Sequence, residues 1–520
     1  MKNLILLNLI TILLFSCQEE KKAIEPEVQK PNIIYILADD LGYAEIGVFG
    51  QEKIETPNID ALGKEGMIFT QHYSSAPVCA PARYMFLTGK HSGKAFIRGN
   101  DEWNDRGDVW NYKAMAKDST LEGQRPVPKG TKTIANYLKD DGYKTALVGK
   151  WGLGAPHTHS IPNEMGFDFF YGFNCQRQAH TYYPLHLYKN RNRVHLANDT
   201  IAPSTPFTKD ADPKNPESYK NYTLTDYAPD LMFKELTGFV SENKDNPFFL
   251  YWATPIPHVA LQAPQRWVDY YIKKFGPEEP YLSGEGNGYF SHQNPHAAYA
   301  AMVSYFDENV GKLVKQLKDE GIYDNTLIVF TSDNGPSYAG GADPEFFDSA
   351  KPFDGKYGKG KGFVYEGGIR VPTFFTWPNK IKAGTTSDLP SAHYDMLATF
   401  AEMVNTPFTE QTDGISFLPT LLGEENQAQH EFLYWEFPEY GGQVAIRMGD
   451  WKVIRQHLND DKEPTLELYN LKDDPTEQVN VAAQHPEILE RAAAIFKKEH
   501  ATAETERFQI PLIEKGLLER

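Results

Sequence analysis

The chain has 520 residues, 41% of them apolar, and a formal net charge of −18 at pH 7. A chain of this length buries a large core and can hold more than one subdomain. The acidic balance excludes the basic surface of a nucleic-acid-binding protein, and the count of three cysteines excludes a disulfide framework. Any anionic ligand must therefore be bound by a local group of cations, against the overall field.

Residues 1–16 carry one lysine and then an apolar run too short to span a bilayer, which predicts a signal peptide. Leu14-Phe-Ser-Cys17 resembles a bacterial lipobox, which implies cleavage before Cys17 and lipidation of its thiol. An ordinary secreted signal with a chance cysteine is the alternative. Residues 17–30 are then a polar tether. We expect a lipoprotein of the bacterial cell envelope, periplasmic or on the outer-membrane surface, whose contact with the membrane is this lipid anchor.

Residues 32–38 form a continuous apolar run, which is typical of a strand covered on both faces. Asp39 and Asp40 follow it directly. Two carboxylates that close a buried strand are costly unless they are paired or bound to a metal, and ligand sites of open α/β sheets gather at such strand ends. Oxygen ligands suit Ca²⁺ or Mg²⁺. The alternative for this pair is a turn or a helix cap.

The stretch Cys79-Ala-Pro-Ala-Arg83 predicts a helix that starts just after the cysteine, because Pro81 presets the first helical turn. The free N–H groups of that turn favour an anion, and Arg83 lies one turn further along the same face. Cys79 is thereby placed for nucleophilic or anion chemistry. A buried free cysteine in a core helix is the alternative. Cys175 is most simply structural, with a Cys79–Cys175 disulfide as the less favoured option.

Polar residues follow three further predicted strands, and long helices alternate with these strands, as in an α/β fold. The strands and the residues after them are 145–149 with Lys150, 247–252 with His258, and 326–330 with Asp333 and Asn334. The helices are expected at 131–141 and 296–320. We therefore expect acidic oxygens, cationic groups and a reactive cysteine to converge at one edge of a sheet.

The remaining stretches carry weaker signals. Lys361 belongs to a basic run between residues 351 and 370, most of which a solvated loop explains. Arg177 and His180 are candidates for substrate contact, although a plain polar loop is the simpler interpretation. Residues 190–225 are polar and rich in proline, which predicts a loop or an insertion.

From about residue 425 the pattern changes to short strands. They are expected at residues 432–436, 444–447, 451–454 and 466–470, and a helix begins at about residue 486. This predicts a small antiparallel sheet with a helix. We divide the chain into a catalytic domain at 31–424 and a C-terminal subdomain at 425–520.

Six motifs within residues 31–480 resemble, in the same order, those of the type I sulfatases, the formylglycine-dependent family of the alkaline-phosphatase-like superfamily. They are Asp39-Asp-Leu-Gly-Tyr43, Cys79-Ala-Pro-Ala-Arg83, Gly149-Lys-Trp-Gly-Leu-Gly154, Gly166-Phe-Asp-Phe-Phe-Tyr-Gly172, Thr331-Ser-Asp-Asn-Gly335 and Gly360-Lys-Gly-Phe-Val-Tyr-Glu-Gly-Gly368. The resemblance implies a mixed sheet sandwiched by helices, with a smaller C-terminal sheet-and-helix subdomain. It also implies hydrolysis of sulfate esters of a polysaccharide or oligosaccharide, of which algal ulvan and carrageenan are examples.

The resemblance also assigns roles to residues. Cys79 is oxidised by a maturation enzyme to formylglycine, whose hydrate attacks sulfur and is stabilised by Arg83. Lys150 and Lys361 bind the sulfate, and His258 binds it and protonates the leaving alcohol as a general acid. One Ca²⁺ is held by Asp39, Asp40, Asp333, Asn334 and the modified Cys79. Arg177 and His180 are further candidates for substrate binding.

Gly152 departs from the family pattern, because it stands where a histidine assigned to sulfate release usually sits. His157, His159, or Asp333 acting through water, are the candidate replacements, with His180 as the next. Two other functions stay open at this point. A phosphoester or phosphonate hydrolase of the same superfamily would use much of this site, and a non-catalytic glycan-binding lipoprotein is the second alternative.

Overall fold

The computed structural model describes residues 30–199, 201–284, 288–406 and 411–516. The predicted signal peptide, Cys17 and all of the tether except Lys30 lie outside these residues. Within the described ranges, no helix is both long enough and apolar enough to cross a bilayer.

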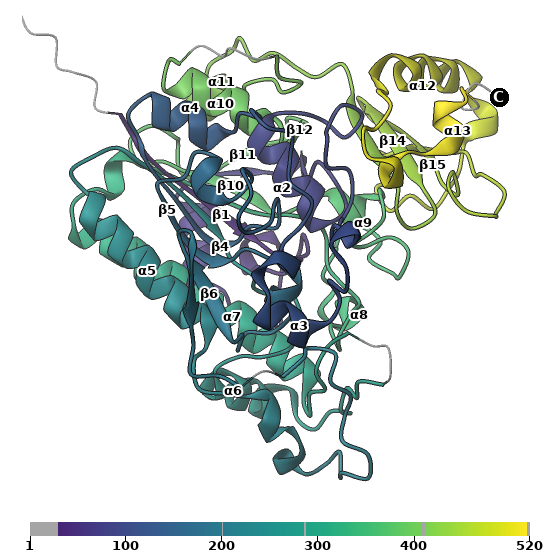
Figure 1. The fold of residues 1–520 in the computed structure, drawn as a ribbon. Coiled ribbons are helices and arrows are strands. Elements are labelled where there is room, and N and C mark those ends of the chain that lie inside the picture. The colour runs from purple at the N-terminus through teal and green to yellow at the C-terminus, as the bar shows by residue number, and fades with distance from the viewer. Residues whose placement is uncertain (1–29, 200, 285–287, 407–410, 517–520) are drawn as a thin grey trace, which may run out of the picture.

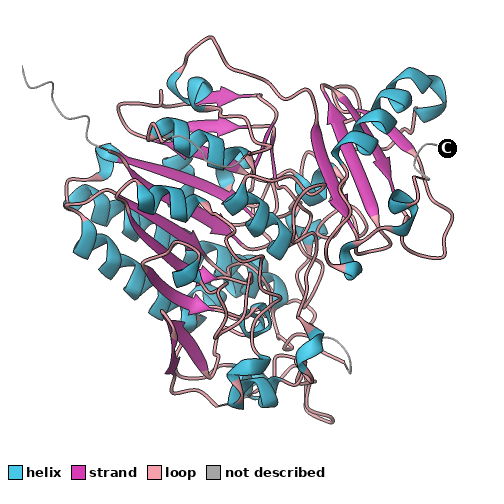
Figure 2. Cartoon of the chain, turned by 45° about the horizontal axis from the view of Figure 1, so that its top comes forward, coloured by secondary structure: helices cyan, strands magenta, loops and turns pink. Residues whose placement is uncertain are grey.

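A ten-stranded mixed sheet runs through the larger part of the molecule (Figure 2). Its strand order is β11 (Thr385–Ser387), β2 (Met67–Phe69), β10 (Thr373–Thr376), β9 (Thr326–Ser332), β1 (Asn32–Ala38), β8 (Phe248–Ala253), β4 (Lys144–Lys150), β5 (Phe169–Phe173), β6 (His186–Lys189) and β7 (Asn192–His195). The central strands from β9 to β5 are parallel. The four predicted apolar runs are confirmed as the strands β1, β4, β8 and β9, and all of their residues are buried except Lys144 at the start of β4.

Two layers of helices cover the sheet, one on each face. The side chains of β1 point alternately to the two faces, so they pack in both layers. Ile34 and Ile36 pack with α1 (Pro57–Lys64), α5 (Ala228–Asn243), α6 (Gln265–Phe275) and α7 (Pro295–Asp319). The last three of these helices are labelled in the lower part of Figure 1. Tyr35 and Leu37 pack in the upper layer, which contains α2 (Cys79–Thr88), α4 (Ile134–Asp140), α10 (Asp395–Met403) and α11 (Leu418–Leu422). The predicted α/β class is confirmed, and α4 and α7 are the two helices expected from the sequence.

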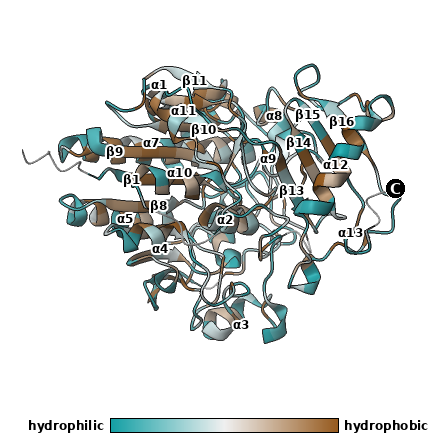
Figure 3. Ribbon diagram, turned by 90° about the horizontal axis from the view of Figure 1, so that it is seen from above, coloured by the Kyte–Doolittle hydropathy of each residue, from teal (hydrophilic) through white to brown (hydrophobic). Residues whose placement is uncertain are grey.

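The predicted small C-terminal sheet is also present. Its strands are β13 (Leu433–Phe437), β14 (Gln443–Met448), β15 (Trp451–Arg455) and β16 (Glu467–Asn470), antiparallel in chain order. One face packs on α12 (Pro486–Glu499), as Figure 3 shows. The other face, which includes Trp435, packs against Val78 and Val364 of the larger part. This sheet therefore touches the residue that precedes Cys79.

Residues 190–225 are only partly the loop that the sequence predicted. They contain β7, which pairs with β6 at the edge of the large sheet, and a 3-10 turn η6 (Pro216–Tyr222). The edge position explains the missed strand, because an edge strand exposes polar side chains and lacks an apolar run. The shorter elements are β3 (His72–Tyr73), β12 (Ser391–Ala392), α3 (Tyr112–Lys117), η5 (Gln176–His180), α8 (Pro344–Phe347), α9 (Glu366–Ile369) and α13 (Pro511–Glu514).

Candidate active site

Carboxylate and amide groups follow two neighbouring strands. β1 leads into Asp39 and Asp40, and β9 leads into Asp333 and Asn334; the two strands are parallel and in register. The backbone N–H of Asp40 donates to Asp333 Oδ1 (3.1 Å), and Asn334 Nδ2 donates to Asp40 Oδ1 (2.8 Å). All four side chains are buried. The structure thus brings together the four residues that the sequence predicted for a metal site.

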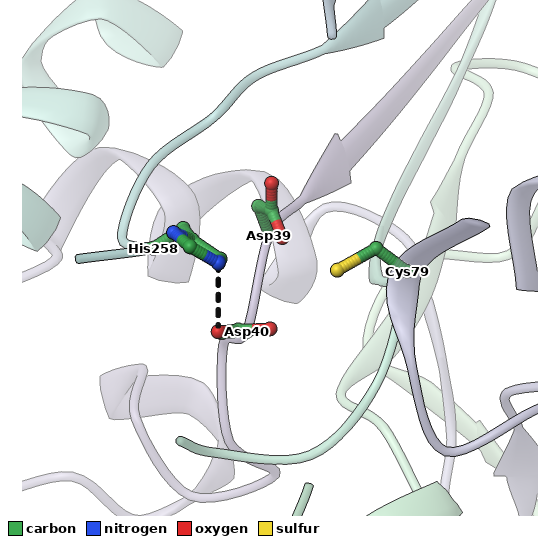
Figure 4. A group of neighbouring side chains, drawn as sticks. All are labelled: Asp39, Asp40, Cys79 and His258. Atoms are coloured by element: carbon green, nitrogen blue, oxygen red, sulfur yellow. Dashed lines mark ion pairs between the residues drawn. The ribbon is translucent and has the colours of Figure 1, made fainter. Parts of the chain in front are cut away.

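Cys79 begins α2 and is buried beside this group. In Figure 4 the two aspartates lie between the Cys79 sulfur and the ring of His258. One ligand atom of each of these four residues lies within 4.8 Å of the others. Burial, and then the negative charge of Asp39, raises the pKa of the Cys79 thiol to about 12, so the unmodified thiol is a poor nucleophile. Cys79 and Cys175 are both free, and the disulfide alternative is wrong.

Arg83 connects the nucleophile helix to the ends of the strands. Its Nε and Nη2 donate to Asp333 Oδ2 (3.0 and 2.8 Å), and Nη1 donates to the carbonyl oxygen of Lys150 (2.9 Å). Nη2 also lies 3.4 Å from Asp39 Oδ2. Burial opposes the charged form, but Asp333 and Asp39 outweigh it and raise the pKa of the guanidinium. The arginine therefore stays charged and fixes α2 against the ends of β4 and β9.

Two lysines pair with the two aspartates. Lys150 Nζ lies 2.6 Å from Asp39 Oδ2, and Lys361 Nζ lies 2.6 Å from Asp40 Oδ1. When Arg83 and Asp333 are included, the cluster contains three cations and three carboxylates. A divalent cation added to this set would make the cluster positive, which suits a sulfate ester.

Two buried oxygens of the cluster have no hydrogen-bond partner, namely Asp39 Oδ1 and Asn334 Oδ1. A buried oxygen without a donor is costly, and a bound cation removes that cost. The donors that Asp39, Asp40, Asp333 and Asn334 offer are oxygens, which is the chemistry preferred by Ca²⁺ and Mg²⁺. The residues present therefore fit a hard divalent cation.

His258 faces the cluster from the loop after β8. Its Nδ1 lies 2.5 Å from the carbonyl oxygen of Val259, which assigns the ring proton to Nδ1 and leaves Nε2 3.7 Å from Asp40 Oδ2. Burial and the charge of Lys361 lower the pKa of His258 well below its usual range. His180 stacks on this ring at 5.2 Å between centroids, so η5 reaches the site.

Arg177, on the same short helix, has partners other than the cluster. Its guanidinium pairs with Glu102, donates to the carbonyl oxygen of Leu121 (2.9 Å), and lies 5.5 Å from the centre of the Trp110 ring. These contacts anchor η5 against residues 102–121. The expected contact between Arg177 and the substrate stays a prediction. The contacts of Arg177 in the structure add no support to it.

Gly152 leaves a space that Gln176 fills. Gly152 has φ +75°, and a Cβ built there would lie 2.6 Å from Nε2 and 2.7 Å from Cγ of Gln176. Gln176 is 5% exposed, and its Nε2 has no hydrogen-bond partner. The side chain beside Gly152, two residues after Lys150, is thus an amide with a free donor.

The two histidines proposed to replace the missing one are held elsewhere. His157 Nε2 lies 2.8 Å from Ser119 Oγ, and His159 Nε2 lies 2.8 Å from the carbonyl oxygen of Val127. Both rings therefore contact residues of the 119–127 segment, and neither is held at the cluster. These contacts add no support to the expected role of either ring as the base.

Sequence reasoning also missed two tyrosines at the site. The Tyr289 ring lies 5.1 Å from the ring of His180 and 5.8 Å from that of His258. Tyr440, from the C-terminal sheet, packs on Gly362 beside Lys361. Neither lies in one of the motifs, and Tyr440 lies between two predicted strands of the C-terminal subdomain, a part of the chain in which no site residue was expected.

The comparisons with known proteins decide the family. A family model described as sulfatase matches residues 31–406, which is more than half of the chain. The chain belongs to the sulfatase family. It is therefore a sulfuric ester hydrolase, and the non-catalytic alternative is dropped. A second model, the C-terminal part of N-sulphoglucosamine sulphohydrolase, matches residues 355–502 of this sulfatase.

Relatives of this sulfatase align over nearly its whole length. N-acetylgalactosamine-6-O-sulfatase from Bacteroides thetaiotaomicron is 28% identical, with 90% of this chain and 93% of the relative aligned. Human arylsulfatase A is 28% identical over 88% of this chain and 86% of its own. The crystal structure of Ps i-CgsB in complex with k-i-k-neocarrahexaose is 29% identical, with a TM-score of 0.71 and coverage of 93% and 94%. The similarity includes the C-terminal sheet.

Proposed function

We propose that this sulfatase removes sulfate from a sulfated oligosaccharide or polysaccharide, with Cys79 converted to formylglycine by a maturation enzyme. The observation that carries the proposal is the cluster, in which Cys79 lies beside two carboxylates paired with lysines, and in which buried oxygens of Asp39 and Asn334 have no hydrogen-bond partner. The substrate class is supported by two similar proteins, one named for a sulfated amino sugar and one solved with a neocarrahexaose. Ulvan and carrageenan are examples within this class.

Ca²⁺ fits the oxygen set, and when bound it would neutralise charge on the sulfate and the nucleophile. Asp39, Asp40, Asp333 and Asn334 would hold it, with the modified side chain at position 79 as a further ligand. Once the aspartates have a metal partner, Lys150 and Lys361 can turn their ammonium groups to sulfate oxygens. Arg83 keeps α2 in place through the backbone of Lys150 and the carboxylate of Asp333.

His258 serves the leaving group in this proposal. Its Nδ1 is fixed by the carbonyl oxygen of Val259, which directs Nε2 to the cluster. The negative charge of a bound sulfate favours the protonated ring, and Nε2 then delivers its proton to the sugar oxygen as the bond from this oxygen to sulfur breaks, so that the sugar leaves with a free hydroxyl. His180 supports the ring from behind by stacking.

We also propose that Cys17 is lipidated and that the enzyme works in the bacterial cell envelope, as Leu14-Phe-Ser-Cys17 indicates. Metabolic labelling with a fatty-acid analogue tests this. The wild-type chain should take up the label in a bacterial host, and Cys17→Ala should not. Equal labelling of both chains would contradict the anchor.

The activity is tested with a panel of esters at equal enzyme concentration. The panel contains an aryl sulfate, the matching aryl phosphate, N-acetylgalactosamine-6-sulfate and a sulfated neocarrahexaose. We expect sulfate release from at least one sugar, and little phosphate release. Faster turnover of the aryl phosphate would favour the phosphoester hydrolase. Turnover of the aryl sulfate with none of the sugars would contradict the glycan substrate alone.

A further inference from the structure

Tyrosine rings pack on both sides of Lys361, although the chemistry described above does not use them. A Cβ built at Gly360 would lie 2.8 Å from the Tyr338 ring, and one built at Gly362 would lie 3.0 Å from the Tyr440 ring. The two glycines therefore let these rings approach the backbone beside the lysine that pairs with the cluster.

The two tyrosines belong to a line of four aromatic rings, which we call the aromatic strip. Its members are Tyr338, Tyr357, Phe363 and Tyr440, with neighbouring ring centroids 5.6, 6.3 and 5.6 Å apart. Tyr357 is 77% exposed and Tyr440 is 54% exposed. They are two of the four large aromatic side chains that are exposed within the described residues. Single exposed rings are ordinary, but a continuous strip whose two end members both lie beside an active-site lysine points to a ligand.

Tyr440 is held in place by the C-terminal sheet. It lies in the turn between β13 and β14 with φ +52°, a conformation that costs energy for a residue with a side chain. Its ring stacks on Phe437 (5.9 Å between centroids), and Gln443 Nε2 donates to the carbonyl oxygen of Gly362 (2.8 Å). The hairpin thus fixes an exposed aromatic face beside Lys361.

We propose that the aromatic strip binds the sugar residues next to the sulfated one, so that this enzyme prefers an oligosaccharide to a free sulfated sugar. A pyranose ring presents C–H groups on one face, which pack on an aromatic ring while the hydroxyl groups stay in water. Lys361 would bind the sulfate, the two end members of the strip lie beside this lysine, and the exposed Tyr357 lies between them in the strip. This inference rests on the proposed function.

The test compares oligosaccharides with small substrates in matched variants. We would measure kcat/KM for sulfated neocarrabiose and neocarrahexaose, for N-acetylgalactosamine-6-sulfate free and within a hexasaccharide, and for an aryl sulfate. Tyr440→Ala and Tyr357→Ala should each lower the ratio of hexasaccharide to aryl sulfate turnover about three- to tenfold, mainly through KM. Tyr440→Phe keeps the ring and should retain the ratio. Tyr270→Ala, an exposed tyrosine on α6, is the matched control.

The outcomes separate this inference from the proposed function. If the wild-type enzyme desulfates no sugar of the set, the proposed function fails, and the strip loses its ligand. If the wild-type enzyme desulfates sugars but turns over hexasaccharide and short substrate equally well, only the strip is refuted. An unchanged ratio in Tyr440→Ala and Tyr357→Ala, with unaltered melting temperatures, refutes it as well.

Discussion

Gln176 fills the space beside Gly152, two residues after the active-site lysine Lys150. The amide is buried, its Nε2 lacks a partner, and it stands next to the strand end that carries Lys150. A hydrogen bond to a charged group is worth about 1.5–3 kcal/mol. An amide that donates to a bound sulfate would therefore matter for turnover.

We predict that Gln176→Ala lowers kcat about tenfold or more, whereas His157→Ala and His159→Ala leave kcat unchanged. The reason is that Gln176 supplies the free donor beside Gly152, while the two rings are held at residues 119–127. Steady-state kinetics on the best substrate of the panel measures this. A loss of kcat in either histidine variant, with Gln176→Ala at the wild-type rate, would overturn the assignment.

A second prediction at the scale of single residues concerns the unpartnered oxygens of Asp39 and Asn334. Because a bound cation would give these oxygens a partner, we expect Ca²⁺ to stabilise the fold. A ligand at a hundred times its dissociation constant adds about 2.7 kcal/mol to the free energy of unfolding. The melting temperature of chelated protein should therefore rise on addition of CaCl₂, and less with MgCl₂. Asp39→Asn should abolish the rise, and the exposed control Asp105→Asn should keep it. No rise in verified metal-free wild-type protein would contradict the metal site.

Apart from His180, which lies in a polar stretch, the site residues that sequence reasoning could place lie in motifs or after apolar runs. Asp39 and Asp333 each come directly after a strand, and the ends of parallel strands meet at one edge of a sheet. Lys361 follows no strand, and only its motif singled it out. Gln176 could not be found, because its place depends on how η5 packs against a glycine with positive φ, and neither feature leaves a pattern in the sequence.

At the scale of elements, β3, which comes just before the nucleophile helix, pairs with β12, and two buried histidines lie at this pair: His72 in β3 and His393 directly after β12. The rings of His72 and His393 lie 5.3 Å apart, and both Nε2 atoms lack a partner. Burial lowers the pKa of His72 well below its usual value, and lowers that of His393 to about 3. Both rings are therefore neutral in the folded protein.

This predicts acid sensitivity. A histidine with a lowered pKa in the folded state contributes stability that is complete above the unfolded pKa of about 6.5 and is lost as the pH falls toward 3. At pH 5 the loss for His393 is about 2 kcal/mol. Melting temperatures of wild type and His393→Phe between pH 7 and pH 5 measure it, with His393→Gln as a second variant. Equal slopes in all three proteins would refute this origin.

The elements differ in how far the sequence could predict them. β1, β8 and β9 are buried throughout, so their apolar runs have one structural explanation. The side chains of β7, at the sheet edge, are exposed or half-buried, so this strand has no apolar run or clear apolar–polar alternation from which it could be predicted. The strand order could not be read from the chain, because it depends on crossovers between distant segments.

At the scale of the whole molecule, a buried ionic group joins the C-terminal sheet to the catalytic part. Lys452 of β15 lies 2.8 Å from Glu366 and 2.8 Å from Glu477, and all three are almost fully buried. Glu366 is five residues after Lys361. The group thus connects the subdomain to the loop that carries an active-site lysine.

We predict that Lys452→Met destabilises the protein by about 3–5 kcal/mol, because the buried carboxylates of Glu366 and Glu477 both lose this cation, although Glu366 keeps its ion pair with Arg370. Burial already raises the pKa of Glu477 to about 7, so the loss should be smaller at pH 6 than at pH 8. Lys472→Met, at an exposed position, is the control. Thermal unfolding measures both. A melting temperature of Lys452→Met equal to that of the control at pH 8 would show that the link does not matter.

The central claim is that Cys79, as formylglycine, is the nucleophile of a sulfatase. Peptide mass spectrometry of active enzyme, made with the maturation machinery, tests it most directly when sulfate release is measured on the same preparation. We expect the aldehyde at position 79, and more than about a thousandfold loss of sulfate release in Cys79→Ala with an unchanged melting temperature. An unmodified Cys79 thiol throughout a fully active preparation, or an active Cys79→Ala variant, would contradict the account.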